Sequence, residues 1–548
     1  MKANGRDFDS SRRGFLQRSV IGGVAAAAYP ALGAARVAAA SAASGTEVPA
    51  FELDEARVAD LQAGMAAGKY SARLLVEKYL ARIEQVDKNG PSVNSVIELN
   101  PEAAAIADAL DKERAARGAR GPLHGIPVLI KDNIDTADQM MTTAGSLALM
   151  ESRPAKDSFV GQKLRAAGAV ILGKTNLSEW ANTRSSHSTS GWSGRGGLTK
   201  NPYALDRNAC GSSSGSGAAA AASFCAVAVG TETDGSVVCP SSVSGLVGIK
   251  PTLGLIGRSG IIPIAHSQDT AGPMARTVRD AAILLGALAG VDPDDSMTKD
   301  SAGKAAADYT SFLDPNGLRG ARIGVARKYF GFHEGVDRLM EDCLAEMKRL
   351  GAEIIDPADL PSHGKFDDTE TTVLLYELKA DLKSYLAKRG DEQCRSLKDV
   401  IEFNQRNREK EMPYFGQDIF VKAEAKGPLT DKEYLDALEA NHRLARNEGI
   451  DAVMDKFRLD AIVAPTAGPA WLTDLVDGDH DGGGSSNAAA VAGYPNITVP
   501  AGFIAGLPVG ISFFGRAWSE GMLLKVAYGF EQATRVRKPP RFLARVSV

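Results

Sequence analysis

Cysteine is scarce in this sequence, with only five residues in a chain of 548. Cysteines so few and so widely spaced exclude a small domain held together by a disulfide framework, and the lack of a C-x-x-C pair argues against a zinc or redox site. An odd number also leaves at least one thiol unpaired within a single chain. We therefore expect five free thiols, mostly buried, that pack as small hydrophobic side chains: Cys210, Cys225, Cys239, Cys343 and Cys394.

An excess of charge of either sign is also missing. The 63 basic and 67 acidic side chains give a net charge of −4, so the chain lacks the basic surface typical of proteins that bind nucleic acids or anionic membranes. Hydrophobic residues make up 44% and charged residues 24%, which is ordinary for a globular protein and excludes a largely disordered chain. The seven histidines are dispersed and no H-E-x-x-H motif occurs, so we expect no metal site.

An apolar run long enough to span a membrane is absent near the N-terminus. Residues 11–17, Ser-Arg-Arg-Gly-Phe-Leu-Gln, have the pattern of a twin-arginine export signal, and a weakly apolar stretch follows at 20–35. This stretch is shorter than the roughly 20 residues that cross a bilayer, so we expect no membrane anchor. We interpret residues 1–40 as a signal peptide for the twin-arginine export machinery and predict that residues 41–548 are periplasmic or secreted. The alternative is a disordered basic N-terminus.

Short apolar runs alternate with helical patterns along the rest of the chain, which predicts an α/β fold with a largely buried sheet in one large domain. Ser71 should begin a helix, and Asp54 should cap another that continues through Met65. Residues 365–455 are mostly charged and helical in pattern, and we expect them to form a helical layer that borders a cleft. The predicted buried strands are residues 128–130, 170–172, 227–229, 323–325, 354–355 and 461–463.

Lys131 stands directly at the end of the first of these apolar strands, in the run Gly-Ile-Pro-Val-Leu-Ile-Lys-Asp-Asn. A lysine in such a place ordinarily extends its ammonium group to water. Catalysis by an amine needs the opposite, because lowering the pKa of a lysine from ~10.4 to ~8 takes roughly 3 kcal/mol of destabilisation of the charged form. Emergence from a buried strand is one way to supply this, so Lys131 is a candidate base.

Two further segments combine serine with glycine. Residues 210–217, Cys-Gly-Ser-Ser-Ser-Gly-Ser-Gly, form a predicted loop whose backbone can approach a ligand closely, and the alanines at 218–222 suit a tightly packed helix. A flexible linker is the alternative, but a linker would not lead directly into core elements. Residues 230–240, Gly-Thr-Glu-Thr-Asp-Gly-Ser-Val-Val-Cys-Pro, follow the strand 227–229. Ser236 is thereby placed as an exposed nucleophile, and the backbone N–H groups before it can bind an anion.

Other motifs in the chain match known patterns without their structural context. Residues 211–215 fit the G-x-S-x-G nucleophile elbow, but a polar loop precedes them where that motif requires a strand. Residues 296–299 fit S-x-x-K, but neither S-D-N nor K-T-G occurs. The glycine-rich loop lacks the Gly-Lys-Ser/Thr ending of a phosphate-binding loop, which disfavours nucleotide binding. Three histidines near the motifs are interpreted as structural: His124, His187 and His266.

Taken in order, the Lys131 segment, the loop 210–217 and the segment 230–240 resemble the amidase signature family. Ser212 and Ser236 are 24 residues apart, which is the spacing of the two catalytic serines of that family. The resemblance covers about residues 55–530 and implies a large mixed β-sheet covered by helices on both faces. Further matching runs lie at 173–180, 245–252, 269–274, 464–466, 492–495 and 506–510.

The resemblance also implies catalytic roles. Lys131 is then the general base, Ser236 the nucleophile, and Ser212, in a cis peptide, the bridge that relays the proton between them. A serine hydroxyl is a poor nucleophile until a base removes its proton, and each well-aimed backbone donor stabilises the oxyanion by roughly 3–4 kcal/mol. The donors are expected to be the backbone N–H groups of Thr233, Asp234, Gly235 and Ser236.

Two positions depart from most of the family: Asp234 replaces a glycine, and Val238 stands where arginine is usual. Residues 230–240 and 185–192 look instead like the bacterial peptide amidase subgroup, which hydrolyses C-terminal peptide amides to acid and ammonia without a cofactor. We therefore expect an amidated peptide or small amide as substrate. Alternatives are a general aliphatic or aryl amidase, a glutamine amidotransferase A subunit, which the export signal disfavours, and a binding protein without activity, which the complete set of three side chains disfavours.

Overall fold

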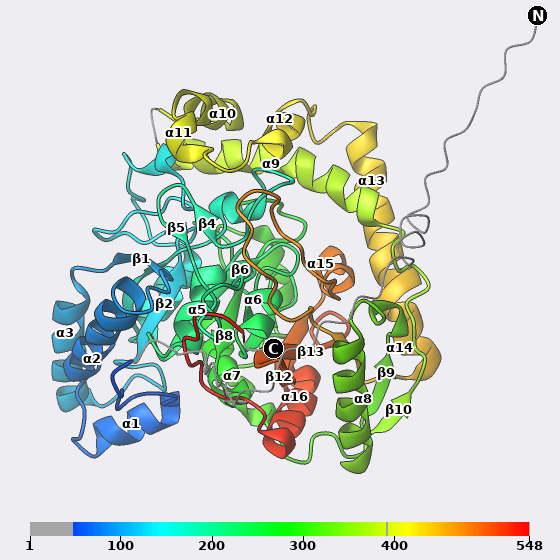
Figure 1. Cartoon of the computed structure of the whole chain (residues 1–548), viewed down its shortest axis with the longest axis horizontal. Helices are drawn as coiled ribbons and strands as arrows, with labels where there is room; N and C mark the ends of the chain where they lie inside the picture. Colours follow the sequence, from blue (N-terminus) through cyan, green and yellow to red (C-terminus); the bar gives the residue numbers. More distant parts are fainter. Residues whose placement is uncertain (1–47, 391–392, 547–548) are drawn as a thin grey trace, which may run out of the picture. The chain divides into compact units, whose positions relative to one another are not determined.

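The computed structural model describes residues 48–390 and 393–546 of the chain (Figure 1). These residues belong to one compact unit, Ala43–Val548, so the described part of the chain is a single domain, as predicted. The predicted export signal, residues 1–40, lies outside the described residues. Within the described ranges, no helix combines the length and the apolar character needed to cross a membrane.

The domain is built on one large sheet of eleven strands, in the order β1-β3-β2-β6-β8-β7-β12-β13-β11-β9-β10. Parallel and antiparallel neighbours both occur in it, which confirms the prediction of a large mixed sheet. A separate two-stranded sheet pairs β4 with β5. The strands are β1 Val96–Leu99, β2 Pro127–Lys131, β3 Val170–Thr175, β4 Trp192–Ser193, β5 Gly197–Leu198, β6 Val227–Glu232, β7 Val247–Lys250, β8 Thr270–Ala275, β9 Arg322–Val325, β10 Glu353–Ile355, β11 Ala461–Pro465, β12 Asn496–Ile504 and β13 Leu507–Phe514.

The parallel region around β2 carries the candidate site. β2 lies between β3 and β6 and runs parallel to both, and every residue of the three strands is buried. Parallel strands covered on both faces need continuous apolar runs, which explains why the sequence identified them, and all six predicted strands are present. Because the carboxyl ends of parallel strands meet at one edge, the ends of β2 and β6 lie together there.

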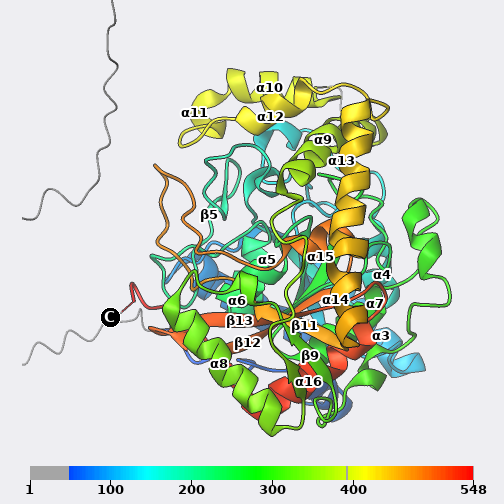
Figure 2. The ribbon, with the colours of Figure 1, turned by 90° about the vertical axis from the view of Figure 1, so that its right-hand side faces the viewer.

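Helices cover both faces of the sheet, as the family resemblance implied. α5 contacts β2 and β6, α6 contacts β7, β12 and β13, and α7 and α16 pack against the sheet and each other. Figure 2 shows α5, α6 and α15 on one side of β12 and β13, with α8 and α16 on the other. The helices are α1 Val58–Ala66, α2 Ala72–Arg82, α3 Ala103–Arg117, α4 Phe159–Ala166, α5 Ser214–Ala221, α6 Val238–Val243, α7 Val278–Leu288, α8 Glu334–Arg349, α9 Asp367–Arg389, α10 Leu397–Arg406, α11 Arg408–Glu411, α12 Asp418–Glu424, α13 Lys432–His442, α14 Asp451–Phe457, α15 Asn487–Ala492 and α16 Glu520–Thr534.

The first two helices test the predicted caps. Ser71 caps α2 as predicted, because its hydroxyl accepts a hydrogen bond from the Leu74 amide at 3.1 Å. The prediction that Asp54 caps α1 is wrong, since that helix begins after Arg57. The capping carboxylate is Asp60, which accepts a hydrogen bond from the Arg57 amide at 3.1 Å. A capping residue inside the first turn explains why the sequence pattern placed the start too early.

Residues 365–455, apart from the undescribed pair 391–392, contain helices α9 to α14 and the π-helical stretch Arg443–Ile450. α9 is 23 residues long and lies at the top of Figure 2 with α10, α11 and α12. Its residues Asp381, Tyr385 and Arg389 line a cavity of about 630 Å³. This charged helical segment thus forms one wall of a cavity.

The first turn of α5 has room only for glycine at position 215. A Cβ atom there would lie 2.3 Å from the carbonyl oxygen of Ser95 and 2.4 Å from that of Asn176. The Gly215 amide donates to the same Asn176 oxygen at 3.0 Å, and the Asn176 amide donates to the Ser95 oxygen at 2.8 Å, so neither backbone can withdraw without losing a hydrogen bond. The Ser/Gly-rich segment is therefore a closely packed junction and not a flexible linker.

We expect Gly215→Ala to lower the free energy of unfolding by about 2–3 kcal/mol, the cost typical of overpacking against atoms that cannot move. Gly121→Ala is the matched control, because a Cβ at Gly121 would meet nothing within 4 Å, and its effect should stay within about 0.5 kcal/mol. Urea denaturation of both variants measures the difference. Equal unfolding midpoints would contradict the packing argument.

Candidate active site

Lys131 ends β2 and its side chain is fully buried. Its Nζ lies 2.7 Å from Ser212 Oγ and 2.8 Å from Thr231 Oγ1, and it lies 3.3 Å from the Thr231 carbonyl oxygen. These three contacts are to uncharged oxygens. Such an environment satisfies the hydrogen-bonding capacity of an amine without offering the close counter-ion that would hold it as an ammonium.

The chemical state of Lys131 follows from this burial. Burial lowers the pKa of Lys131 from 10.5 to about 7, although the charges of Asp269 and Glu232 oppose the shift. A large fraction of the amine is thus uncharged near neutral pH and has a lone pair that can accept a proton. The position that the sequence indicated as a candidate base therefore has both the contact and the pKa that a base requires.

The glycine-rich loop places Ser212 against Lys131. The peptide bond between Gly211 and Ser212 is cis, as the family resemblance implied. The next residue, Ser213, ties the loop to the end of β6, because its Oγ donates to the Thr231 carbonyl at 3.0 Å and accepts from the Thr231 amide at 3.1 Å. Loop and strand end are thus held together beside the amine.

Ser236 lies in the turn between β6 and α6 and is only 8% exposed. The prediction of an exposed serine is therefore wrong, because the turn packs against the loop 210–217. Its carbonyl oxygen accepts a hydrogen bond from the Ser213 amide at 3.2 Å, so the backbone of Ser236 adjoins the loop that carries Ser212. The structure therefore brings the side chains of Lys131 and Ser212 into contact and places the backbone of Ser236 against the loop that carries Ser212. Lys131 contacts Ser212 directly, and Ser236 is joined to the same group through Ser213.

Glu232 holds the other side of this turn. Its Oε2 accepts hydrogen bonds from the backbone amides of Val237 at 2.7 Å and Val238 at 3.0 Å. Burial raises the pKa of Glu232, and the charge of Lys250 and these amides oppose the shift. Val238, which stands where the family usually has arginine, contributes through its backbone and needs no charged side chain for this bond.

The residues expected to form the oxyanion hole make up the turn itself. Gly235 has a φ of 76°, in the left-handed region that favours glycine. Thr233 Oγ1 donates to Asp269 Oδ1 at 2.6 Å, which fixes the start of the turn. Burial raises the pKa of Asp234 to about 6, although the nearby Ser486 opposes the shift. The turn is thus anchored at both ends, which is the condition for backbone donors that do not move during a reaction.

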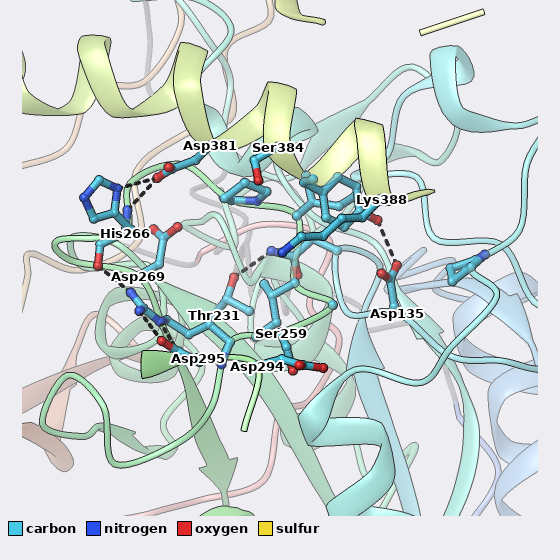
Figure 3. Close-up of a pocket in the computed structure, with 18 of the residues that line it drawn as sticks. Asp135, Thr231, Ser259, His266, Asp269, Asp294, Asp295, Asp381, Ser384 and Lys388 are labelled. Atoms are coloured by element: carbon cyan, nitrogen blue, oxygen red, sulfur yellow. Dashed lines mark hydrogen bonds and ion pairs between the residues drawn. The ribbon is translucent and has the colours of Figure 1, made fainter. Parts of the chain in front are cut away.

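Two cavities reach this turn. The larger, about 630 Å³, is lined by Thr231 and Thr233 on one side and by α9 on another, and its carboxylates are interleaved with basic side chains (Figure 3). The smaller, about 430 Å³, is lined by Gly211, Asp234 and Gly235. The two linings have no residue in common. Each cavity thus touches a different part of the turn.

Two groups of ligand-type side chains in the described ranges lie close enough together to hold a metal ion: His266 with Glu377 and Asp381, and Asp474 with Asp477 and His480. Neither group includes a predicted catalytic residue. In the first, Nδ1 lies 2.9 Å from Asp381 and Nε2 3.4 Å from Glu377. Burial would lower the pKa of His266, but these carboxylates outweigh it and raise the pKa. His266 is thus held by two carboxylates, as expected of a structural histidine, and it also lines the larger cavity.

The prediction of five free thiols is wrong. Cys210 and Cys239 form a disulfide, with Cα atoms 6.1 Å apart, whereas Cys225 and Cys343 are free and buried. The two bonded cysteines are 29 residues apart, and only the packing of the loop 210–217 beside α6 brings them together, so their spacing gave no signal. The disulfide joins the residue before Gly211 to α6, and it therefore links the segments of both predicted catalytic serines.

We expect loss of this disulfide to lower the free energy of unfolding by about 3–4 kcal/mol, the chain-entropy contribution of a loop of this length. The variant Cys210→Ser/Cys239→Ser should unfold at the same lowered temperature with and without reductant. The untreated wild type should unfold at a higher temperature and approach the variant after reduction. Thermal unfolding measures this, and a variant as stable as the oxidised wild type would contradict it.

Two residues that hold the site together were not among the predicted site residues. Thr231 Oγ1 contacts Lys131 and accepts a hydrogen bond from Asn133 Nδ2 at 2.9 Å, and Glu232 anchors the turn of Ser236. Both stand inside the segment 230–240 that the sequence singled out, so their position at a strand end was visible. Nothing in the sequence shows that one side chain turns toward the amine and the other toward α6.

Comparisons with known proteins agree with this geometry. The family model described as Amidase matches residues 74–524. A protein named probable amidase from Arabidopsis thaliana is 41% identical over 90% of this chain and 93% of its own length. The glutamyl-tRNA(Gln) amidotransferase A subunit of Pseudomonas syringae pv. syringae is 35% identical over 89% and 100%. The X-ray structure of native peptide amidase from Stenotrophomonas maltophilia is 51% identical, covers 90% of this chain and 99% of its own, and has a TM-score of 0.86. The chain therefore belongs to the amidase signature family and is an amide-hydrolysing enzyme.

Proposed function

We propose that this amidase hydrolyses a carboxamide to the acid and ammonia through an acyl ester on Ser236. The observation that carries the proposal is the buried amine of Lys131, with Nζ 2.7 Å from Ser212 Oγ and a pKa lowered to about 7. A protonated lysine accepts no proton, so only a lysine of this kind can serve as the base of a serine relay.

In the first step, Lys131 accepts the hydroxyl proton of Ser212 while Ser212 accepts that of Ser236. Ser236 Oγ forms a bond to the carbonyl carbon, and the carbonyl electron pair moves to the oxygen. Backbone amides of the turn 233–236 donate hydrogen bonds to this oxyanion. When the intermediate collapses, the C–N bond breaks, and the Lys131 ammonium returns a proton through Ser212 to the departing nitrogen, which leaves as ammonia.

In the second step, a water molecule takes the place of the ammonia. Lys131, neutral again, accepts a proton from the water through Ser212, and the water oxygen forms a bond to the acyl carbon. The second intermediate expels Ser236 Oγ, which regains its proton along the same route, and the acid leaves. Lys131 alternates between one charged and one neutral form in both steps, so a pKa near neutrality serves both directions of transfer.

The C-terminal amide of a peptide is the substrate that we favour. The peptide amidase of Stenotrophomonas maltophilia is 51% identical over 90% of this chain, and residues 185–192 and 230–240 look like that subgroup where they depart from most of the family. Cavities of about 630 and 430 Å³ also have the size of sites for ligands larger than the simplest amides.

The alternatives retain the same three catalytic residues. A general aliphatic or aryl amidase is compatible with the name of the Arabidopsis relative. The Pseudomonas syringae relative is named for a reaction on tRNA, but a net charge of −4 offers no basic surface for RNA. The predicted export signal would also separate the chain from a tRNA-dependent reaction.

We further propose that the enzyme is exported by the twin-arginine machinery and is periplasmic or secreted. The pattern in residues 11–17 supports this location. The disulfide between Cys210 and Cys239 supports it independently, because disulfides persist in oxidising compartments and are rare in the cytosol. The disulfide would then form after export of the folded chain.

Purified residues 41–548 should release ammonia from amidated peptides at a higher kcat/KM than from acetamide or benzamide. Ser236→Ala should reduce kcat/KM by at least about 10³-fold, because loss of the nucleophile leaves only binding and oxyanion stabilisation. The matched control is Ser311→Ala, at an exposed serine, which should retain activity. Circular dichroism should show that both variants are folded. An acyl group trapped on a serine other than Ser236 would contradict the mechanism.

We expect kcat/KM to rise with pH through about 7, because Lys131 must be uncharged to accept a proton, and to fall about tenfold per pH unit below that. Asp234 and Asp269 also have pKa values raised to about 6 by burial, so a second measurement must show that the inflection near pH 7 belongs to Lys131. The residual activity of Lys131→Ala, measured from pH 5 to 9, should show no inflection near pH 7. A wild-type profile that stays level from pH 5 to 8 would contradict the role of Lys131.

A further inference from the structure

The smaller cavity carries negative charge that no cation of its lining compensates. Four aspartates are among its described lining residues, and no lysine, arginine or histidine is. The larger cavity differs, because Lys156, Arg258, Lys388 and Arg389 accompany its acidic side chains. A cleft lined by charge of one sign concentrates ligands of the opposite sign. The four residues of the smaller cavity are Asp234, Asp477, Asp479 and Asp481.

Asp479 is held in the wall by neutral donors. Its carboxylate accepts hydrogen bonds from the Ser190 amide at 3.0 Å and hydroxyl at 2.5 Å, from Asn208 Nδ2 at 3.1 Å and from Trp471 Nε1 at 3.2 Å. These groups stabilise a carboxylate but bring no positive charge. Among the described residues no cation forms an ion pair with Asp479, and the half-buried Trp471 beside it offers an aromatic ring, a surface that attracts cations.

Asp477 and Asp481 flank this residue on the loop between β11 and α15, which is orange in Figure 1. Both are exposed. Burial raises the pKa of Asp479, and the charge of Asp481 adds to that shift. Thr189 Oγ1 donates to the Asp474 carbonyl at 2.6 Å, which ties this loop to the segment 185–190. The two segments together form the rim of the cavity, and the loop between β11 and α15 supplies its aspartates. We call this the acidic rim.

Asp234 extends the negative charge to the catalytic turn. Its Oδ1 is buried, and among the described residues it has no hydrogen-bond partner. A buried acceptor without a partner is costly, so a donor from a bound ligand would complete its hydrogen bonding. Because Gly211 and Gly235 line the same cavity, this space runs from the catalytic turn to the acidic rim.

On the basis of the proposed function, we propose that the smaller cavity receives the acyl portion of a peptide amide and that its aspartates recognise an alkylammonium group there. This group is the α-ammonium of a short peptide or the side chain of a basic residue. The neutral donors around Asp479, the unpartnered Oδ1 of Asp234 and the aromatic ring of Trp471 all favour such a cation. An acidic or N-acylated substrate gains nothing from them.

The test uses alanyl-phenylalaninamide with a free amine, an N-acetyl group or an N-succinyl group, which places a positive, neutral or negative charge at one end. At pH 7 most of the free amine is charged, since its pKa is ~7.7–8.0. Ammonia release should follow that order in kcat/KM. Raising the salt to about 0.5 M should reduce the preference, because salt screens charges at an exposed rim.

The variant Asp477→Asn/Asp481→Asn should lower the ratio of kcat/KM between the free and succinylated amides by about tenfold, since each exposed pair contributes up to about fivefold. Asp294→Asn, at an exposed residue of the larger cavity, is the matched control and should leave the ratio unchanged. Nα-acetyl-lysyl-phenylalaninamide and its glutaminyl analogue, compared in the same proteins, distinguish a side-chain ammonium from the α-ammonium.

Equal kcat/KM for the three alanyl substrates, or a ratio that the double variant does not change, would overturn this inference while the amidase mechanism stands. Absence of ammonia from every peptide amide would overturn the proposed substrate class and this inference together. Three results together would support this inference: the expected order of kcat/KM among the three alanyl substrates, a smaller preference at high salt, and a smaller preference in the double variant but not in Asp294→Asn.

Discussion

The burial of one amine is the constraint on which the candidate site depends. Moving the pKa of Lys131 from 10.5 to about 7 corresponds to a free energy on the order of 5 kcal/mol, which is comparable with the net stability of a whole domain. The fold supplies it by ending β2 between two parallel neighbours, with helices covering both faces. A strand at the edge of the sheet would leave the same lysine hydrated and charged.

Close packing around this amine explains why the segments rich in serine and glycine are rigid. Gly215 is needed because the backbones of Ser95 and Asn176 would contact any side chain there. The disulfide of Cys210 and the hydrogen bonds of Glu232 hold the two sides of the serine-bearing region. Residues 210–217 have the composition of a flexible linker but a fixed geometry, because their small side chains allow neighbouring backbones to pack closely against them.

The sequence predicted the parts of this arrangement that local patterns determine. Buried strands require uninterrupted apolar runs, which is why five of the six predicted strands were found. The sixth, β10, is present but partly exposed at the edge of the sheet, so the prediction that residues 354–355 are buried is wrong. The cap at Ser71 was found because it is a local hydrogen bond. The contact of Thr231 with Lys131, the anchoring of the Ser236 turn by Glu232 and the pairing of Cys210 with Cys239 were missed. The first and the last join residues 100 and 29 positions apart, whose proximity depends on the tertiary fold. The partners of Glu232 are only five and six residues away, but the bonds form because the turn folds back onto its side chain. The wrong prediction of Asp54 as the cap of α1 has a similar cause. The capping carboxylate, Asp60, lies inside the helix, so the start of the helix could not be placed from the sequence pattern.

The aspartate in the catalytic turn connects the chemistry with the choice of substrate. A carboxylate at position 234, where most of the family has glycine, stands beside the amides that would stabilise an oxyanion, and its charge opposes the charge that develops there. Burial moderates this, because it raises the pKa of Asp234 and so disfavours the charged form. A cation bound in the adjoining cavity would offset that charge at the moment when the oxyanion forms. An acidic residue that hinders hydrolysis of neutral amides would in this way favour substrates that carry their own positive charge.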